Sequence, residues 1–190
     1  MLNTTGKYNL IDISFLLPVN SDDTVLLIGE NALLAEGLSK VCKRVIKNTI
    51  SSPLCDKGSL DLIIVNDMAK GESLNSQLST LNNLLKEGGY ICLPFFNVWR
   101  GGYSYRCVSR KLIEAGFKDI ESYIPIPSHI NPKFIITTKD DSPLKYYLSH
   151  HFERDSFYKS LIYIAVRLSS AAGIFKYIAP SYIITARKFG

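Results

Sequence analysis

The sequence lacks the features that mark several classes of protein. Its four cysteines have no paired spacing and mostly stand among apolar neighbours, so buried thiols are favoured over zinc ligands. The beginning of the chain has no basic region followed by a long apolar core and a small-residue cleavage site. We therefore expect no secretory signal and a cytoplasmic location.

Strong charge of one sign is also missing. The formal net charge is +5, and the Lys and Arg residues are scattered along the chain, so nucleic acid binding is not indicated. The adjacent His150 and His151 would point about 100° apart on a helix, so they do not form a metal-binding pair one helical turn apart. We therefore expect no metal site.

Glycine is scarce at the turn where it would be most informative, in the segment DTVLLIGENALLAEG that begins at Asp23. Val25 to Ile28 form a continuous apolar run, as in a strand buried on both faces of a parallel sheet. Gly29 ends this strand, and a helix is predicted from about Asn31 to Cys42. Because the amino end of such a helix attracts anions, this turn is a candidate ligand site, although it carries a single glycine.

Strand and helix patterns alternate along the first two thirds of the chain. Apolar runs of strand length are separated by segments whose leucines recur every three or four residues. This alternation predicts an α/β protein, folded as a three-layer αβα sandwich. The predicted strands are Thr24–Ile28, Arg44–Thr49, Asp61–Val65, Tyr90–Phe96 and Lys118–Ile126, and the later helices are Ser73–Lys86 and Tyr103–Ala115.

The chain length favours a single domain with one appendage. We expect a lead-in over residues 1–22, a core over 23–126 and a C-terminal segment over 127–190. In the C-terminal segment NPKFIITTKD suits a strand or an extended stretch, Pro143–Ile178 is mostly helical in pattern, and PSYIITARK suits a final short strand.

One stretch of the C-terminal segment, Leu161–Phe175, is strongly apolar. It is shorter than the roughly 20 residues that span a bilayer. A core helix is the favoured interpretation. A peripheral membrane contact through residues 161–178, or a homodimer contact, is the alternative.

Four segments have recognisable motifs, and the last three are more specific in combination than any one of them alone. The four are VLLIGENALLAEGL, PLCDKGSLDLIIVND, LLKEGGYICL and KLIEAGFKDIESY, and they lie between Asp23 and Tyr123. Together they resemble the motifs of the class I S-adenosylmethionine-dependent methyltransferases. The resemblance implies a Rossmann-like sheet of seven strands whose last strand is antiparallel, with PSYIITARK at that last strand. It also implies S-adenosylmethionine as the cofactor.

The first motif departs from the family pattern. Family members usually have GxGxG after the first strand, whereas this sequence has Gly29 alone. Asn31 and Leu33 stand at the positions of the other two glycines. Side chains therefore occupy the approach to the cofactor.

The second strand also departs from the pattern. Family members place an acidic residue at its tip, where a carboxylate accepts hydrogen bonds from both ribose hydroxyls. No acid stands between Arg44 and Pro53, and Asn48 offers only a neutral side chain. The interval 43–53 is too short for the usual strand, helix and strand, which predicts that one βα unit is missing and that the sheet is shortened.

The resemblance and the strand tips together select the residues expected to hold the cofactor. Glu30 would hydrogen-bond the amino group of the methionine moiety, or would only stabilise the positive end of the helix. The candidate cofactor-binding residues are Gly29, Glu30, Asn31, Asn48 and Asn66.

Two residues are candidates for catalysis by proton transfer. Asp67 follows a buried strand at the edge where open sheets bind ligands, and the alternative is a turn-forming residue. His129 stands between prolines in a predicted loop within reach of the same crevice, and the alternative is an ordinary loop histidine.

The loop FFNVWRGGYSYR after the strand Tyr90–Phe96 is the candidate substrate-binding segment. Its arginines could pair with a carboxylate or a phosphate, and a hydrophobic cap over the core edge is the alternative. The candidate substrate-binding residues are Asn97, Arg100, Tyr103 and Tyr105.

Two functions are compatible with these observations. The first is a divergent S-adenosylmethionine-dependent methyltransferase acting on a small-molecule or glycan-type acceptor. The second is a pseudoenzyme, a non-catalytic scaffold that binds a partner protein or another ligand. A nicotinamide-dependent dehydrogenase is disfavoured, because its glycine fingerprint and the acidic residue about 20 positions later are both absent.

Overall fold

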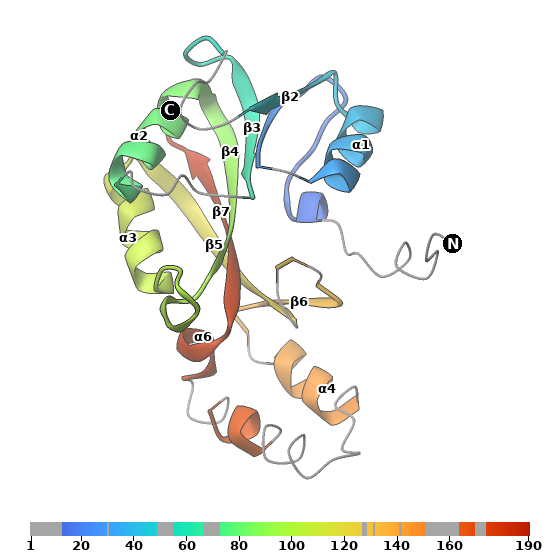
Figure 1. The fold of residues 1–190 in the computed structure, drawn as a ribbon, viewed down its shortest axis with the longest axis vertical. Helices are drawn as coiled ribbons and strands as arrows, with labels where there is room; N and C mark the ends of the chain where they lie inside the picture. Colours follow the sequence, from blue (N-terminus) through green and yellow to red (C-terminus); the bar gives the residue numbers. More distant parts are fainter. Residues whose placement is uncertain are drawn as a thin grey trace.

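The computed structural model of this chain describes residues 13–29, 31–48, 55–66, 73–126, 129–130, 132–140, 142–150, 164–169 and 174–190. A mixed seven-stranded sheet in the order β2-β1-β3-β4-β7-β5-β6 is its centre (Figure 1). The strands β1 to β4 are parallel, β7 is antiparallel to both β4 and β5, and β6 is antiparallel to β5. The strands are β1 Thr24–Ile28, β2 Arg44–Asn48, β3 Leu60–Val65, β4 Leu85–Phe96, β5 Phe117–Ile126, β6 Phe134–Thr137 and β7 Ser181–Lys188.

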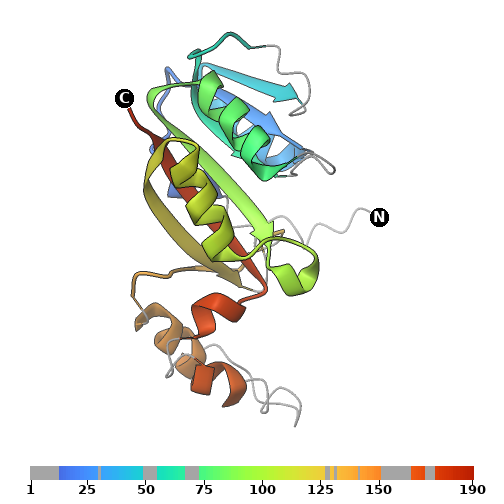
Figure 2. The same ribbon diagram turned by 90° about the vertical axis from the view of Figure 1, so that its left-hand side faces the viewer.

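Helices cover both faces of the sheet, which confirms the predicted three-layer αβα sandwich. Helix α1 (Ala32–Val41) lies on one face, and α2 (Leu74–Leu84) and α3 (Tyr105–Glu114) lie side by side on the other (Figures 1 and 2). The apolar run of β1 explains this arrangement. Val25 and Leu27 face the core under α1, whereas Leu26 and Ile28 face the core under α2 and α3.

The two edges of the sheet differ from each other. At one edge, among the described residues, β2 pairs with β1 alone and the next strand along the chain is β3, which agrees with the predicted loss of one βα unit on this side. At the other edge β6 adds a short antiparallel strand beside β5. The antiparallel β7, in the segment PSYIITARK, lies between β4 and β5 as the resemblance implies.

The junction between α2 and β4 differs from the prediction. The expected helix over Ser73–Lys86 ends at Leu84, and β4 begins at Leu85, earlier than expected. Leu85 is buried, has extended backbone angles and pairs with Leu60 of β3. Its burial beside β3 therefore favours a strand over a further helical residue. Gly88 and Gly89, which follow the expected helix in the sequence, lie within β4.

The described part of the lead-in contains a short 3-10 helix, η2 (Ile13–Leu16). The C-terminal segment contains α4 (Ser142–His150), a helical turn over residues 164–169 and α6 (Phe175–Ile178), at the lower end of the sheet (Figure 1). In the part of the chain that the structure describes, no helix combines the length and the hydropathy needed to cross a bilayer.

The favoured core-helix interpretation of Leu161–Phe175 is wrong for most of its described residues. Ile164 and Leu168 are exposed, and Phe175 at the start of α6 is buried. The physical reason is that the sheet's core is already filled by β4, β5, β7, α2 and α3, so only one face of this segment finds a buried surface. Residues 161–163 and 170–173 lie outside the described part.

Candidate functional site

The turn after β1 has the conformation expected of a ligand-binding turn. Gly29 has a φ of 91°, in the left-handed region that favours glycine. Asn31 is the N-cap of α1, and its side-chain oxygen accepts a hydrogen bond from the Leu34 N–H at 3.0 Å. Asn31 therefore occupies one of the N–H groups that an anion would otherwise bind. Leu33, at the third glycine position, is 52% exposed. Glu30 lies outside the described residues.

The tip of β3 lies beside this turn. The backbone N–H of Asn66 donates to the carbonyl of Ile28, the last residue of β1, at 2.8 Å. The side-chain Nδ2 of Asn66 is buried and has no hydrogen-bond partner among the residues that the structure describes. A buried amide without a partner is costly in a folded protein, which makes this donor a candidate for binding a ligand. Asp67 lies outside the described residues.

The three strand tips that carry predicted cofactor residues are adjacent. Asn48 is the last residue of β2 and is in register with Ile28, which is in register with Val65 of β3. The sequence prediction therefore selects positions that the fold brings to one edge of the sheet. The conformation of Gly29 and the donor of Asn66 are compatible with a bound cofactor. The side chains of Asn31 and Leu33, which stand where the family has glycine, leave less room for one.

The tip of β4 leads into a 3-10 turn, η3 (Val98–Arg100). Asn97 is only 3% exposed, and its amide is fully engaged inside the chain. Its Nδ2 donates to the carbonyls of Tyr177 and Ala179 at 3.0 and 2.9 Å and to the Tyr182 hydroxyl at 3.2 Å. Its Oδ1 accepts from the Val98 N–H at 2.7 Å. These contacts favour a structural role for Asn97, which joins η3 to α6.

The other predicted substrate residues surround the end of β4 in different ways. The guanidinium of Arg100 lies 4.8 Å from the centre of the Phe96 ring and is exposed. The N–H of Tyr103 donates to the Phe96 carbonyl at 3.0 Å. Tyr105 begins α3 and stacks on Tyr182 with ring centres 5.8 Å apart. Of these side chains, only Arg100 is presented openly to a ligand.

His129 lies at the same end of β4. Its ring packs on Phe96 with centres 4.4 Å apart, and its backbone N–H donates to the Ser181 hydroxyl at 3.2 Å. Its Nδ1 is buried without a partner. Burial, followed by the positive charge of Arg100, lowers the pKa of His129 to about 4. The imidazole is therefore neutral near neutral pH, a good hydrogen-bond acceptor and a weak base.

Sequence analysis missed Phe96 as a member of this site. Its ring contacts both His129 and Arg100 and so holds the two candidates together. The signal was its position as the last apolar residue of a strand, directly before a loop rich in aromatic residues and arginine.

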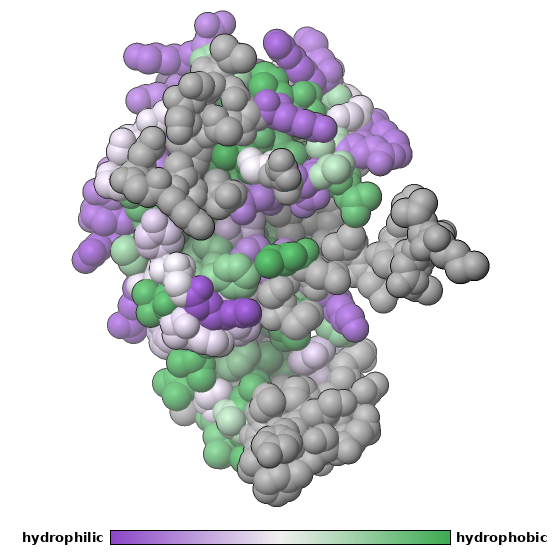
Figure 3. Space-filling view, in the orientation of Figure 1, coloured by the Kyte–Doolittle hydropathy of each residue, from purple (hydrophilic) through white to green (hydrophobic). Residues whose placement is uncertain are grey.

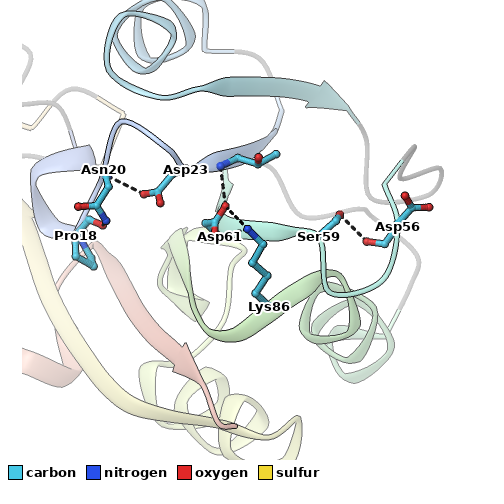
Figure 4. A network of polar contacts seen from close by, with 8 residues as sticks. Pro18, Asn20, Asp23, Asp56, Ser59, Asp61 and Lys86 are labelled. Atoms are coloured by element: carbon cyan, nitrogen blue, oxygen red, sulfur yellow. Dashed lines mark hydrogen bonds and ion pairs between the residues drawn. The ribbon is translucent and has the colours of Figure 1, made fainter.

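The starts of the parallel strands, at the end of the sheet opposite to these tips, carry a polar network of a different kind (Figure 4). Asp61 of β3 accepts from the Thr24 N–H at 2.8 Å and from the Lys86 ammonium at 2.7 and 2.9 Å. Burial opposes ionisation of Asp61, but the hydrogen bonds from Lys86 and Thr24 outweigh it and lower the pKa of the carboxyl. A shallow cavity of about 270 Å³ lies over this network. Asp61 links the starts of β1, β3 and β4, which favours a structural role for this carboxylate.

Known proteins similar to this chain are found by comparing structures and not by comparing sequences. The sequence matches no protein-family model and no curated protein. A structure of an S-adenosylmethionine-dependent methyltransferase from Archaeoglobus fulgidus is similar with a TM-score of 0.57 and 14% identity, over 93% of this chain and 91% of that one. Haemonchus contortus phosphoethanolamine N-methyltransferase 2 in complex with S-adenosylmethionine is similar with a TM-score of 0.56 and 12% identity.

The match to the Haemonchus enzyme covers 94% of this chain and 51% of that one, so this chain spans about half of that enzyme's length. The cyclase SpnF is similar with a TM-score of 0.50 and 14% identity, over 93% of this chain and 79% of that one. The chain has the fold of the class I S-adenosylmethionine-dependent methyltransferases.

Proposed function

We propose that this chain binds S-adenosylmethionine at the tips of β1 and β3 and transfers its methyl group to a small-molecule or glycan-type acceptor held beside the tip of β4. The observation that carries the proposal is the buried, unpartnered Nδ2 of Asn66. It lies next to the Gly29 turn, in a chain with the fold of these methyltransferases.

The residues that would hold the cofactor act through their backbone and one amide. Gly29 lets the chain turn sharply at the end of β1, and the N–H groups of α1 that Asn31 does not cap face the same edge. These groups would hold the carboxylate of the cofactor. Asn66 would donate from Nδ2 to another acceptor atom of the same ligand.

S-adenosylmethionine, when bound, supplies an electrophilic methyl group on a positively charged sulfur. The contribution of this chain is to position the acceptor, which is worth more than proton transfer for such a displacement. The neutral Nδ1 of His129 would accept a hydrogen bond from the O–H or N–H of the acceptor and orient its lone pair. Arg100 would attract an anionic group on the same molecule.

A second candidate function is a non-catalytic scaffold, which the β1–α1 turn itself favours. Asn31 caps α1 with its own side chain, and Leu33 stands where a glycine would let a cofactor approach. The similarity to the cyclase SpnF supports the broader point that this fold serves proteins other than methyltransferases.

Calorimetric titration with S-adenosylhomocysteine separates the two. We expect the wild-type chain to bind with micromolar affinity, and Asn66→Ala to weaken binding by about tenfold or more, because a ligand acceptor loses its donor. Asn83→Ala is the matched control, because Asn83 is an exposed asparagine on α2. Absence of heat at millimolar ligand would refute the methyltransferase proposal and support the scaffold. Equal affinities for the two variants would refute the role of Asn66.

A further inference from the structure

The end of the molecule below the sheet carries an exposed apolar surface. In Figure 3 the apolar colour gathers at the lower left, over η3 and α6. Trp99 is 61% exposed, and its indole N–H donates to the Ile178 carbonyl at 3.2 Å, which joins η3 to α6. The guanidinium of Arg106 on α3 lies 4.5 Å from the centre of the Tyr177 ring. We call this the η3–α6 surface, formed by Val98, Trp99, Arg100, Arg106, Tyr177 and Ile178.

The helical turn at residues 164–169 adds to the same end of the molecule. The backbone N–H of Ile174, just before α6, donates to the Ser169 carbonyl at 2.9 Å. Leu168 and Arg167 are exposed on this turn. The turn at residues 164–169 therefore has the same apolar and basic character as the η3–α6 surface.

The charge of this surface has one sign. Arg100, Arg106 and Arg167 form no ion pair with an acidic side chain among the residues that the structure describes. The described segments that supply the surface, residues 88–113, 164–169 and 174–190, contain no Asp or Glu. Among the described residues, the arginines therefore lie beside exposed Trp, Tyr and aliphatic side chains without an acidic partner.

We propose that the η3–α6 surface binds the surface of an anionic phospholipid bilayer. Trp and Tyr side chains favour the membrane–water interface, where the ring is buried and the polar group stays wet. Exposed aliphatic side chains such as Val98 and Ile178 would enter the acyl boundary, and the arginines would pair with lipid phosphates. This inference does not depend on the proposed function.

The composition of the surface disfavours two other occupants. A second copy of this chain, related by a two-fold axis, would bring the same arginines against each other with no acid between them. A nucleic acid would satisfy the arginines and the aromatic rings, but it would leave Val98, Ile178 and Leu168 without an apolar partner.

Trp99 is the only tryptophan of the chain, so its fluorescence reports directly on this surface. We expect its emission to shift to the blue when vesicles of phosphatidylcholine with phosphatidylglycerol are added, and not with phosphatidylcholine alone. Salt should reverse the shift, because it screens the arginines. Absence of a shift with the anionic vesicles would overturn the proposal.

Matched variants locate the contact in a vesicle co-sedimentation assay. Arg106→Gln with Arg167→Gln removes two charges from the surface, and Arg44→Gln with Lys47→Gln removes two exposed charges from β2. We expect the first pair to weaken partitioning roughly tenfold or more and the second pair to bind nearly like the wild type. Equal losses in both pairs would show that only net charge matters and would overturn the proposed surface.

The apolar part has its own pair of variants. Trp99→Ser should reduce the bound fraction severalfold, whereas Phe15→Ser, at a residue that is also 61% exposed, should leave it unchanged. If Trp99→Ser instead dissolves a concentration-dependent dimer while vesicle binding is absent, the surface is a dimer contact and the membrane proposal fails.

Discussion

The two ends of the parallel strands use polar groups in opposite ways. We call the side of the sheet where these strands start the amino edge and the side where they end the carboxyl edge. At the amino edge, Asp61 accepts hydrogen bonds from Thr24 and Lys86, so its carboxylate is fully engaged. At the carboxyl edge, the Nδ2 of Asn66 and the Nδ1 of His129 are buried without a partner. Because an unpaired buried polar atom costs stability, the carboxyl edge holds groups that the fold alone does not require. The polar groups of the amino edge therefore serve stability, whereas those of the carboxyl edge are, in our proposal, the ones that bind a ligand.

The same contrast exists within the carboxyl edge, between two asparagines. Asn97 follows β4 and donates to three acceptors inside the chain. Asn66 follows β3 and donates from its side chain to none among the described residues. One residue type at two neighbouring strand tips therefore serves structure in one place and, in our proposal, a ligand in the other.

The largest effect is expected for Asn97→Ala. The change removes the partner of two carbonyls and of the Val98 N–H, and one partner of the Tyr182 hydroxyl, at buried and half-buried positions, so we expect a loss of about 4 kcal/mol in the free energy of unfolding. Urea denaturation measures it, with Asn83→Ala as the control. A loss as small as that of the control would mean that water or other donors replace the amide, and the structural assignment of Asn97 would fail.

The next effect is the dependence of stability on pH through His129. Its folded pKa of about 4 lies below the ordinary value of 6.5, so the unfolded chain binds more protons between these values. The stabilisation is complete above about pH 6.5 and falls as the pH drops through about 4. We expect wild type to lose about 3 kcal/mol more than His129→Gln between about pH 7 and pH 4. Parallel pH profiles of the two proteins would contradict the burial of a neutral imidazole.

A smaller effect is expected at the amino edge for Asp61→Asn. The lost ion pair is partly exposed and screened, so we expect a cost of about 1–2 kcal/mol at neutral pH. Because the folded pKa of Asp61 is lowered, the stabilisation is complete above about pH 4 and is lost as the pH falls through the folded pKa. The exposed Asp56, changed to Asn, is the control in urea denaturation. Equal stability of the two variants would remove the structural role of this network.

The smallest effect on stability is expected for Asn66→Ala. Its Nδ2 has no partner to lose among the described residues, so the free energy of unfolding should stay within about 0.5 kcal/mol of wild type, while ligand affinity falls. A destabilisation comparable to that of Asn97→Ala would show that Asn66 is a structural residue, and the contrast between the two asparagines would disappear.

Much of the fold could be predicted from the sequence, because buried parallel strands have continuous apolar runs. Val25–Ile28 and Leu62–Val65 show this pattern, and both lie in the sheet as expected. The boundary at Leu85 could not be predicted, since a leucine at that point suits either a helix end or a buried strand. Its pairing with Leu60, distant in sequence, decides the outcome.

The site could be predicted only in part. Strand tips identify Gly29 and Asn66, because the carboxyl ends of parallel strands meet at one edge. The contrast between Asn66 and Asn97 is not predictable from the sequence. It depends on whether the Tyr177 and Ala179 carbonyls, distant in sequence, lie beside the tip of β4. The pairing of His129 with Phe96 likewise depends on a contact between distant segments.

The most direct test of the contrast between the two edges is an amide NMR spectrum recorded with and without S-adenosylhomocysteine. Our account predicts that the Gly29 N–H and the side-chain amide of Asn66 shift on addition of the ligand, while Lys86 and Gly89 at the amino edge do not. Shifts concentrated around the cavity over Asp61, or none at millimolar ligand, would contradict it.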